Sequence, residues 1–234
     1  MSYENLAILK EFGEDNLPDL DVVVMATLEL FEKEGMPDVK LPGLENPIIA
    51  GSGNAKVTAK ILFSNQSAVF ADENNYNQLS QRKDVDGAIV FSASGAKHAP
   101  MQVQEFKRMG LDTYLVTCNK NAEAAKLLDD NHVIYTPKNR EPYTYNTSTY
   151  LGWLLALTGE SPSHIIKFIK EEVQPRIWKS LNNYDGFLLI TPNMFEVCNQ
   201  LLETKFIELF GRRISRDMKT YEELKHAITV VPYE

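Results

Sequence analysis

The segment FSASGAK, at residues 91–97, carries two hydroxyl side chains, a glycine and a lysine between an apolar run and a helical pattern. The first turn of a helix leaves backbone N–H groups unpaired, and its dipole attracts an anion. Hydroxyls, amides and one positive charge at such a turn can surround a phosphate group. The segment therefore predicts a site for a phosphorylated small molecule. The residues expected to bind the phosphate are Ser92, Ser94, Gly95 and Lys97.

A second turn, Gly51-Ser52-Gly53-Asn54, also follows an apolar run. Ser52, Gly53 and Asn54 are expected to add polar contacts to the same ligand. The glycine pair also allows a dinucleotide-binding reading, with Asp72 as the acid that would hold a ribose. Lys56 occupies the third small position of that fingerprint and would crowd the contact between helix and strand, so this alternative is the weaker one.

The composition is that of a globular protein with an acidic surface. The chain has 234 residues, of which 44% are hydrophobic and 24% charged, and a net charge of -8. An acidic surface repels nucleic acid and anionic membranes, so a phosphate site must rely on local donors. The two cysteines, Cys118 and Cys198, have no metal-like spacing, and we expect no secretion signal because residues 1–5 show neither a basic start nor an apolar core. We expect a cytoplasmic protein that needs no metal and no organic cofactor.

Apolar runs alternate with helical stretches from Pro47 onward. This alternation predicts a parallel-sheet αβα sandwich, flavodoxin-like, whose ligands bind at the carboxyl ends of the strands. The expected strands are near 47–50, 67–71, 86–91, 112–117 and 132–135. The expected helices are 20–34, 55–63, 73–79, 97–109, 122–128 and 147–158.

A shorter, partial repetition of the strand–turn–helix pattern follows. A helix is expected from Pro162 to about Leu181, a strand at 187–190 and a long helix to about Phe210. A short strand at 212–216 and a short helix at 221–226 would complete it. We therefore predict an N-terminal helical segment at 1–44, a first α/β lobe at 45–160 and an abbreviated second lobe at 161–234.

With these elements in place, the chain resembles the SIS (sugar isomerase) family of phosphosugar isomerases over roughly residues 47–232. Residues 51–55 resemble the family's G-x-G-x-S turn, and residues 92–97 resemble its S-x-S-G-x-T loop. Residues 205–208 (KFIE) and 223–226 (ELKH) are similar to segments of the isomerase half of glucosamine-6-phosphate synthase. The resemblance implies an SIS-type fold and an aldose–ketose isomerisation of a sugar phosphate.

The resemblance also implies roles for individual residues. His226 would open the sugar ring, Glu208 would move a proton between C1 and C2, and Lys205 would balance the charge near Glu208. Without the resemblance, Lys205 and Glu208 would be an ordinary surface ion pair. Where the family has serine and threonine, this chain has Ala55 and Lys97. A non-catalytic protein that binds or senses phosphosugars is therefore the alternative.

The helix expected near 145–157 is rich in apolar and aromatic residues. Such a helix is typical of a packing or dimer surface, and the family often completes its site across a subunit interface. We therefore expect a homodimer whose ligand is a small sugar phosphate, with no nucleic acid and no membrane as partner.

Overall fold

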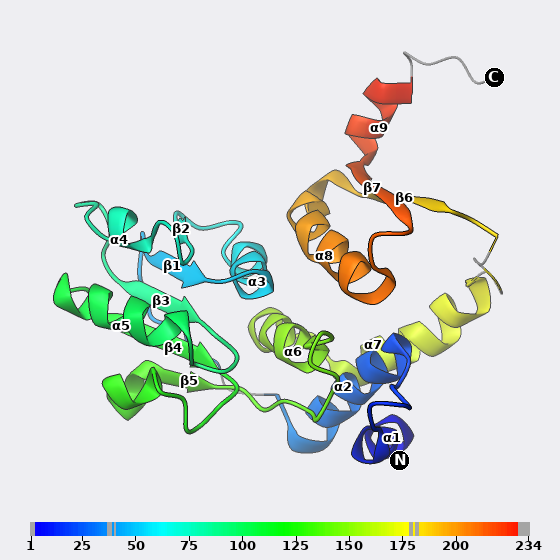
Figure 1. The fold of residues 1–234 in the computed structure, drawn as a ribbon, viewed down its shortest axis with the longest axis horizontal. Coiled ribbons are helices and arrows are strands. Elements are labelled where there is room, and N and C mark those ends of the chain that lie inside the picture. The colour runs from blue at the N-terminus through cyan, green and yellow to red at the C-terminus, as the bar shows by residue number, and fades with distance from the viewer. Residues whose placement is uncertain (1–2, 37–38, 40, 178–179, 181–182, 229–234) are drawn as a thin grey trace. The chain divides into compact units, whose positions relative to one another are not determined.

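The structure is a computed structural model that describes residues 3–36, 39, 41–177, 180 and 183–228. The chain divides into two compact units, Met1–Pro175 and Arg176–Glu234. Figure 1 shows a central sheet with helices in the first unit and a smaller α/β arrangement in the second. Each unit is built from strands that alternate with helices, as the sequence predicts.

A parallel sheet forms the centre of the first unit. Its order in the described part of the chain is β2-β1-β3-β4-β5, which is the flavodoxin-like order. Every neighbouring pair is parallel, with Ile48 opposite both Val69 and Ala88. The strands are β1 (Ile48–Gly51), β2 (Val69–Ala71), β3 (Ala88–Phe91), β4 (Thr113–Thr117) and β5 (Val133–Tyr135). The expected αβα class and all the strands expected in this unit are confirmed.

Helices cover both faces of this sheet because its central strands are apolar on both sides. Ile49, Ile89 and Val116 point into a core with α3 (Asn54–Leu62) and α6 (Thr147–Thr158). The strand residues that alternate with these three point to the opposite face of the sheet and form a second core. This second core is covered by α4 (Tyr76–Leu79), α5 (His98–Arg108) and η1 (Ala125–Leu127). Figure 1 shows α5 and α3 on different sides of the sheet.

The N-terminal helices extend the first unit beyond the sheet. Helix α1 (Glu4–Glu11) packs on α2 (Leu20–Glu34), which in turn packs on α6 and on α7 (Pro162–Phe168). A Cβ atom on Gly152 would lie 2.5 Å from Cζ of Phe31, so α6 and α2 approach closely at that point. The apolar side chains of α6 are largely used inside this unit, and the homodimer stays a prediction.

Three predicted helices differ from the observed ones. Within the stretch 73–79, only α4 is helical, because Asp72 and Asn75 bond the turn through their side chains and compete with a helix. The stretch 122–128 forms only the 3₁₀ turn η1, because the amide of Ala124 bonds to the carbonyl oxygen of Gly95.

The helix that starts at Pro162 also changes character early. It is α-helical only to Phe168 and continues as the π-helical η3 (Ile169–Val173) and the 3₁₀ turn η4 (Gln174–Arg176). The end expected near Leu181 falls outside the described residues.

The second unit contains a parallel pair of strands, β6 (Gly186–Thr191) and β7 (Ser215–Thr220). Between them lie η5 (Asn193–Cys198) and α8 (Asn199–Phe210), and α9 (Tyr221–Ile228) follows β7. The second strand starts later than the predicted 212–216, because α8 ends at Gly211 with φ +67° and a turn intervenes.

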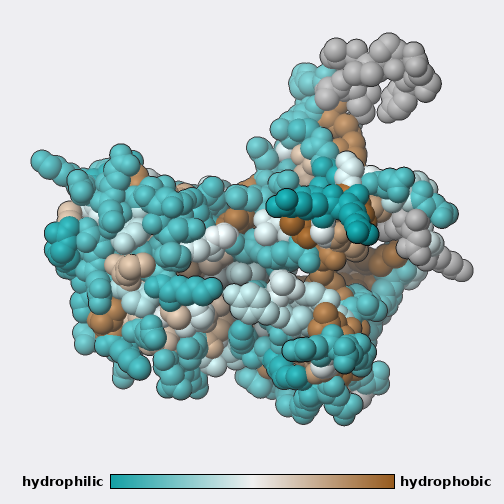
Figure 2. Space-filling view, in the orientation of Figure 1, coloured by the Kyte–Doolittle hydropathy of each residue, from teal (hydrophilic) through white to brown (hydrophobic). Residues whose placement is uncertain are grey.

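The described helices are too short or too polar for any of them to span a membrane. Figure 2 shows mostly hydrophilic residues on the visible face of the first unit.

Candidate phosphate-binding site

A cleft of about 790 Å³ lies in the first unit, at the carboxyl ends of the sheet strands. Parallel α/β sheets bind ligands at this edge, where the strand order reverses between β1 and β3. The turns after β1, β3 and β4 supply one side of the cleft, and the segment after β5 supplies the other. The polar residues that line it are Ser52, Ser92, Ser94, Lys97, His98, Gln102, Asn119, Lys138, Glu141, Tyr143, Asn146 and Tyr150.

The turn between β3 and α5 contains the residues that the sequence predicts to bind a phosphate. The Ser92 hydroxyl oxygen accepts a hydrogen bond from the Gly95 amide at 3.2 Å, and the Ser94 hydroxyl oxygen accepts one from the Ala96 amide at 3.3 Å. A hydroxyl that accepts from the backbone keeps its own proton for a ligand. Both serines therefore hold their oxygens in place and present an O–H donor to the cleft.

Gly95 shapes this turn, because no larger residue fits. Its φ is +59°, and a Cβ atom there would lie only 2.3 Å from Cβ of Ala122. Its amide donates within the turn, to the backbone and side-chain oxygens of Ser92. Gly53 has a φ of +53° and forms the N-cap of α3, where Asn54 is the first helical residue. Gly53, Asn54 and Gly95 thus build the two turns, whereas Ser52, Ser92, Ser94 and Lys97 line the cleft.

The backbone is strained at two points of the cleft. In the described part of the chain, the non-glycine residues with positive φ are Lys97, at 56°, and Asn146, at 47°. Both line the cleft. Such conformations persist only where the surrounding structure enforces them, and they gather at ligand sites. Their position supports the assignment of this cleft as the functional site.

The end of β4 and the turn after it donate hydrogen bonds to the β3–α5 turn. The Asn119 side chain donates to the carbonyl oxygen of Ser94 at 3.1 Å, and the Thr117 hydroxyl donates to the carbonyl oxygen of Ala93 at 3.1 Å. The Cys118 amide also donates to Ala93. These bonds fix the β3–α5 turn against the neighbouring strand, so the two serines sit on a rigid support.

The charge around Ser52 favours the β3–α5 turn over the β1–α3 turn as the phosphate position. The pKa of Glu73 is lowered, first by its own backbone amide and next by the Ser52 hydroxyl. Glu73 is therefore an ionised carboxylate whose negative charge lies close to Ser52. A phosphate placed there would be repelled, whereas Lys97 attracts one at the β3–α5 turn.

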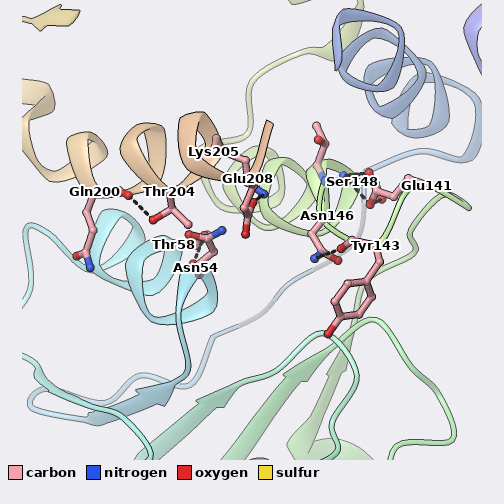
Figure 3. A network of polar contacts seen from close by, with 11 residues as sticks. Asn54, Thr58, Glu141, Tyr143, Asn146, Ser148, Gln200, Thr204, Lys205 and Glu208 are labelled. Carbon is pink, nitrogen blue, oxygen red and sulfur yellow. Dashed lines mark hydrogen bonds and ion pairs between the residues drawn. The ribbon is translucent and has the colours of Figure 1, made fainter. Parts of the chain in front are cut away.

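The opposite wall of the cleft starts with a buried carboxylate. Glu141 accepts hydrogen bonds from the Thr147 amide at 2.9 Å and from the Ser148 hydroxyl at 2.6 Å, and thereby caps the N-terminus of α6 (Figure 3). Burial raises the pKa of Glu141, although its hydrogen bonds with Ser148 act in the opposite direction. Asn146 donates to the carbonyl oxygen of Tyr143, a residue that is 83% exposed.

Arg140 fixes this wall to the N-terminal helices. Its guanidinium donates to the carbonyl oxygens of Lys10 at 3.1 Å and Phe12 at 2.8 Å, and it lies over the Phe12 ring at 4.1 Å. The Tyr145 hydroxyl donates to the carbonyl oxygen of Pro18. Residues before the sheet therefore help to hold the loop that carries Glu141.

Cys118 lines the cleft but is poorly suited to nucleophilic chemistry. Burial raises the pKa of its thiol, and the sulfur contacts the hydroxyls of Thr136 and Thr149. A protonated thiol is a weak nucleophile.

Among the described residues there is no group of three or more metal-ligating side chains.

The residues that the family resemblance connects with catalysis lie in the second unit. Lys205 and Glu208 form an ion pair of 2.5 Å on α8, with the i,i+3 spacing that the sequence predicts (Figure 3). His226 lies on α9, 4.0 Å from the Glu222 carboxylate and 83% exposed in its side chain. Within the described residues, no hydrogen bond or ion pair joins Glu208 to His226.

Sequence reasoning missed several cleft residues. Asn119 lies two residues after β4 and Lys138 three residues after β5, so the rule that ligands meet the carboxyl ends of strands would have found them. Gln102 is a polar residue among the buried residues of α5, and its helical spacing from the apolar residues of that helix would have identified it. Glu141 and His98 also line the cleft.

The dinucleotide alternative receives no support from the geometry. Asp72, the acid expected to bind ribose, forms an ion pair of 2.6 Å with Lys56. That pair lowers the pKa of Asp72, chiefly through the hydrogen bond from Lys56. The Asp72 carboxylate is thus already paired with Lys56, the residue that replaces the third small residue of the dinucleotide-binding fingerprint.

No protein-family model and no curated protein matches this chain by sequence. Its three-dimensional structure is similar to several solved structures. Glucosamine-6-phosphate deaminase from Thermotoga maritima aligns with a TM-score of 0.56 and 14% identity, over 100% of this chain and 74% of that one. Tagatose-6-phosphate ketose/aldose isomerase from Escherichia coli aligns with a TM-score of 0.53 and 11% identity, over 98% and 70% of the two chains.

A candidate phosphosugar isomerase from Bacillus subtilis aligns with a TM-score of 0.53 and 12% identity, over 90% of this chain and 73% of that one. At such low identities these likenesses concern the fold. The resemblance to the sugar isomerase family is therefore confirmed for the fold, and this chain has an SIS-like fold.

Proposed function

We propose that this chain binds a sugar phosphate in the cleft of its first unit and acts as a sugar-phosphate isomerase. The observation that carries the proposal is the β3–α5 turn, where Ser92, Ser94 and Lys97 line a cleft of about 790 Å³. A cleft of this size is within the usual range for a small-molecule site. The phosphate would sit on this turn, and the sugar would extend toward Glu141, Asn146 and Tyr143.

The balance of charge supports an anionic ligand. The chain carries a net charge of -8, yet Lys97 and Lys138 both line this cleft. A phosphate dianion also gains from the positive end of the α5 dipole. The hydroxyls and amides of the other lining residues suit the many oxygens of a sugar.

The proposed chemistry is an aldose–ketose isomerisation. His226 would give a proton to the ring oxygen while the anomeric hydroxyl loses one, which opens the ring. Glu208 would then take the proton from C2 and return it to C1 through an enediol, with no net change in atoms or electrons. Lys205 would balance the charge near Glu208. This chemistry uses proton transfer alone, so the proposal includes no metal or organic cofactor.

A thermal-shift titration with fructose 6-phosphate, glucosamine 6-phosphate, a pentose phosphate and inorganic phosphate tests binding. A ligand at one hundred times its dissociation constant should stabilise the fold by about 2.7 kcal/mol. The absence of a shift with all of these compounds would refute the proposal.

The Glu208→Gln variant tests the catalytic part. It should bind phosphosugars as the wild type does and lose turnover. Glu203→Gln, an exposed change on the same helix, is the matched control and should keep turnover. Full turnover in Glu208→Gln would remove Glu208 from the mechanism.

A protein that binds phosphosugars without converting them is the second candidate. It is favoured by the exposed His226, which is paired with Glu222, and by Ala55 in place of the family's serine. Binding without turnover of any compound in the panel would establish this candidate. We further propose that the protein is a cytoplasmic homodimer, which sedimentation and cell fractionation can test.

A further inference from the structure

Gln102 is an unusual residue on the buried face of α5. Ala99, Val103 and Phe106 share that face and pack into the core beneath the sheet. Gln102 is only 2% exposed, yet it lines the cleft beside the β3–α5 turn. A leucine or methionine would fit the apolar pattern of the helix, so the choice of an amide calls for a reason.

The side-chain nitrogen of Gln102 has no hydrogen-bond partner among the described residues. Buried polar groups are almost always paired, because an unpaired one loses its bonds to water and gains none in return. An unpaired amide that borders a ligand cleft is therefore a donor held ready for a ligand atom. This observation is independent of the serine turn.

The direction of the helix brings this donor toward the β3–α5 turn. Side chains on an α-helix lean toward its N-terminus. Gln102 is the fifth residue of α5, whose first residue, His98, follows Lys97 directly. Its amide therefore extends back toward the end of the helix at which the anion would bind.

We propose that Gln102 is a specificity-determining residue whose Nε2 atom donates a hydrogen bond to an oxygen of the ligand bound in this cleft. The inference rests on the proposed sugar-phosphate binding and adds a residue to it. A phosphate oxygen and a sugar hydroxyl offer the same acceptor chemistry, and the experiment separates them. A ligand without an oxygen at this point leaves the amide unpaired and is selected against.

A role in packing alone makes a different prediction for ligand affinity. If Gln102 only filled space, its replacement by leucine would leave ligand affinity unchanged. If it is a ligand donor, Gln102→Leu removes a buried unpaired group from the free protein and a bond from the complex. The free protein should then unfold at the same or a higher temperature, while affinity falls.

The experiment compares the wild type, Gln102→Leu and Gln104→Leu by isothermal titration and thermal unfolding. Gln104 is an exposed residue of the same helix, so the same substitution there is the matched control. The ligands are inorganic phosphate, fructose 6-phosphate and glucosamine 6-phosphate. Gln102→Leu should raise the dissociation constant at least about tenfold, equal to 1.4 kcal/mol, and Gln104→Leu should leave it unchanged.

Equal losses for inorganic phosphate and the sugar phosphates would assign the bond to a phosphate oxygen. A loss confined to the sugar phosphates would assign it to a sugar hydroxyl. Unchanged affinity in Gln102→Leu, with binding intact in the wild type, would overturn this inference alone. No binding by the wild type to any of the compounds would overturn the proposed function, and this inference with it.

Gln102→Met keeps the length of the side chain and guards against a repacking artefact. Methionine fits the apolar face of α5 but has no N–H to donate. It should weaken binding about as much as Gln102→Leu does. Binding in Gln102→Met as tight as in the wild type would also overturn the inference.

Discussion

The Gly95→Ala substitution tests whether the β3–α5 turn depends on one close contact. At this position φ is +59°, and an added Cβ atom would lie 2.3 Å from Cβ of Ala122, a residue that is 1% exposed. The left-handed backbone costs about 1–2 kcal/mol for alanine. Overpacking of a filled core costs about 1–3 kcal/mol more. Gly95→Ala should therefore lower the free energy of unfolding by about 2–5 kcal/mol.

A control separates the two contributions. Gly110 has a φ of +76° and no atom within 4 Å of its would-be Cβ, so Gly110→Ala carries the backbone cost alone. It should destabilise the protein by about 1–2 kcal/mol. The difference between the two variants then measures the contact with Ala122.

The double variant Gly95→Ala/Ala122→Gly removes the clashing methyl group from the other side. It should recover most of the overpacking cost and leave the backbone cost in place, and a double-mutant cycle gives the coupling directly. Urea unfolding measures the stabilities, and phosphosugar titration measures whether the turn still binds. A loss below 1 kcal/mol in Gly95→Ala, or no recovery in the double variant, would refute this account of the turn.

Two further predictions concern the opposite wall of the cleft. Burial raises the pKa of Glu141 above its ordinary 4.5, so the folded protein holds the carboxyl proton more tightly than the unfolded chain does. The protonated Glu141 therefore contributes to stability at low pH, and this contribution should fall as the pH rises from 4.5 through the raised pKa. Urea unfolding between pH 4 and 8 should therefore show the wild type losing stability relative to Glu141→Gln as pH rises, and a constant or opposite difference would contradict the assignment. Arg140→Ala removes the hydrogen bonds to the carbonyl oxygens at the end of α1 and the stacking on Phe12, and should cost about 1–2 kcal/mol in urea unfolding. Arg140→Lys should recover little of this loss because lysine lacks the planar fork, and full recovery would show that charge alone is sufficient.

Local signals in the sequence predicted most of the fold. The strands of the first sheet are apolar runs ended by polar turns, and the observed β1 to β5 fall inside or within one residue of the expected ranges. The boundaries of α2 and α6 agree with the predicted ranges 20–34 and 147–158. These elements have strong periodicity, so local pattern and tertiary packing favour the same structure.

The weaker elements depended on contacts that the sequence pattern does not show. Side-chain bonds within the Asp72–Asn75 turn shorten α4, and the bond between Ala124 and Gly95 holds the chain near η1 in a 3₁₀ turn. Each contact competes with helix formation over only a few residues, where the helical preference is small.

The sequence by itself determined the composition of the β3–α5 turn, because the hydroxyls, the glycine and the lysine of residues 91–97 follow one strand directly and need no distant partner. It also determined the parallel sheet, because the order of strands and helices allows few other topologies. Only the tertiary structure decided what faces that turn. Gln102 and Glu141 line the same cleft from segments 39 residues apart, because α5 and the loop before α6 meet over one edge of the sheet. Such a meeting depends on packing across the whole unit, which no short stretch of sequence encodes.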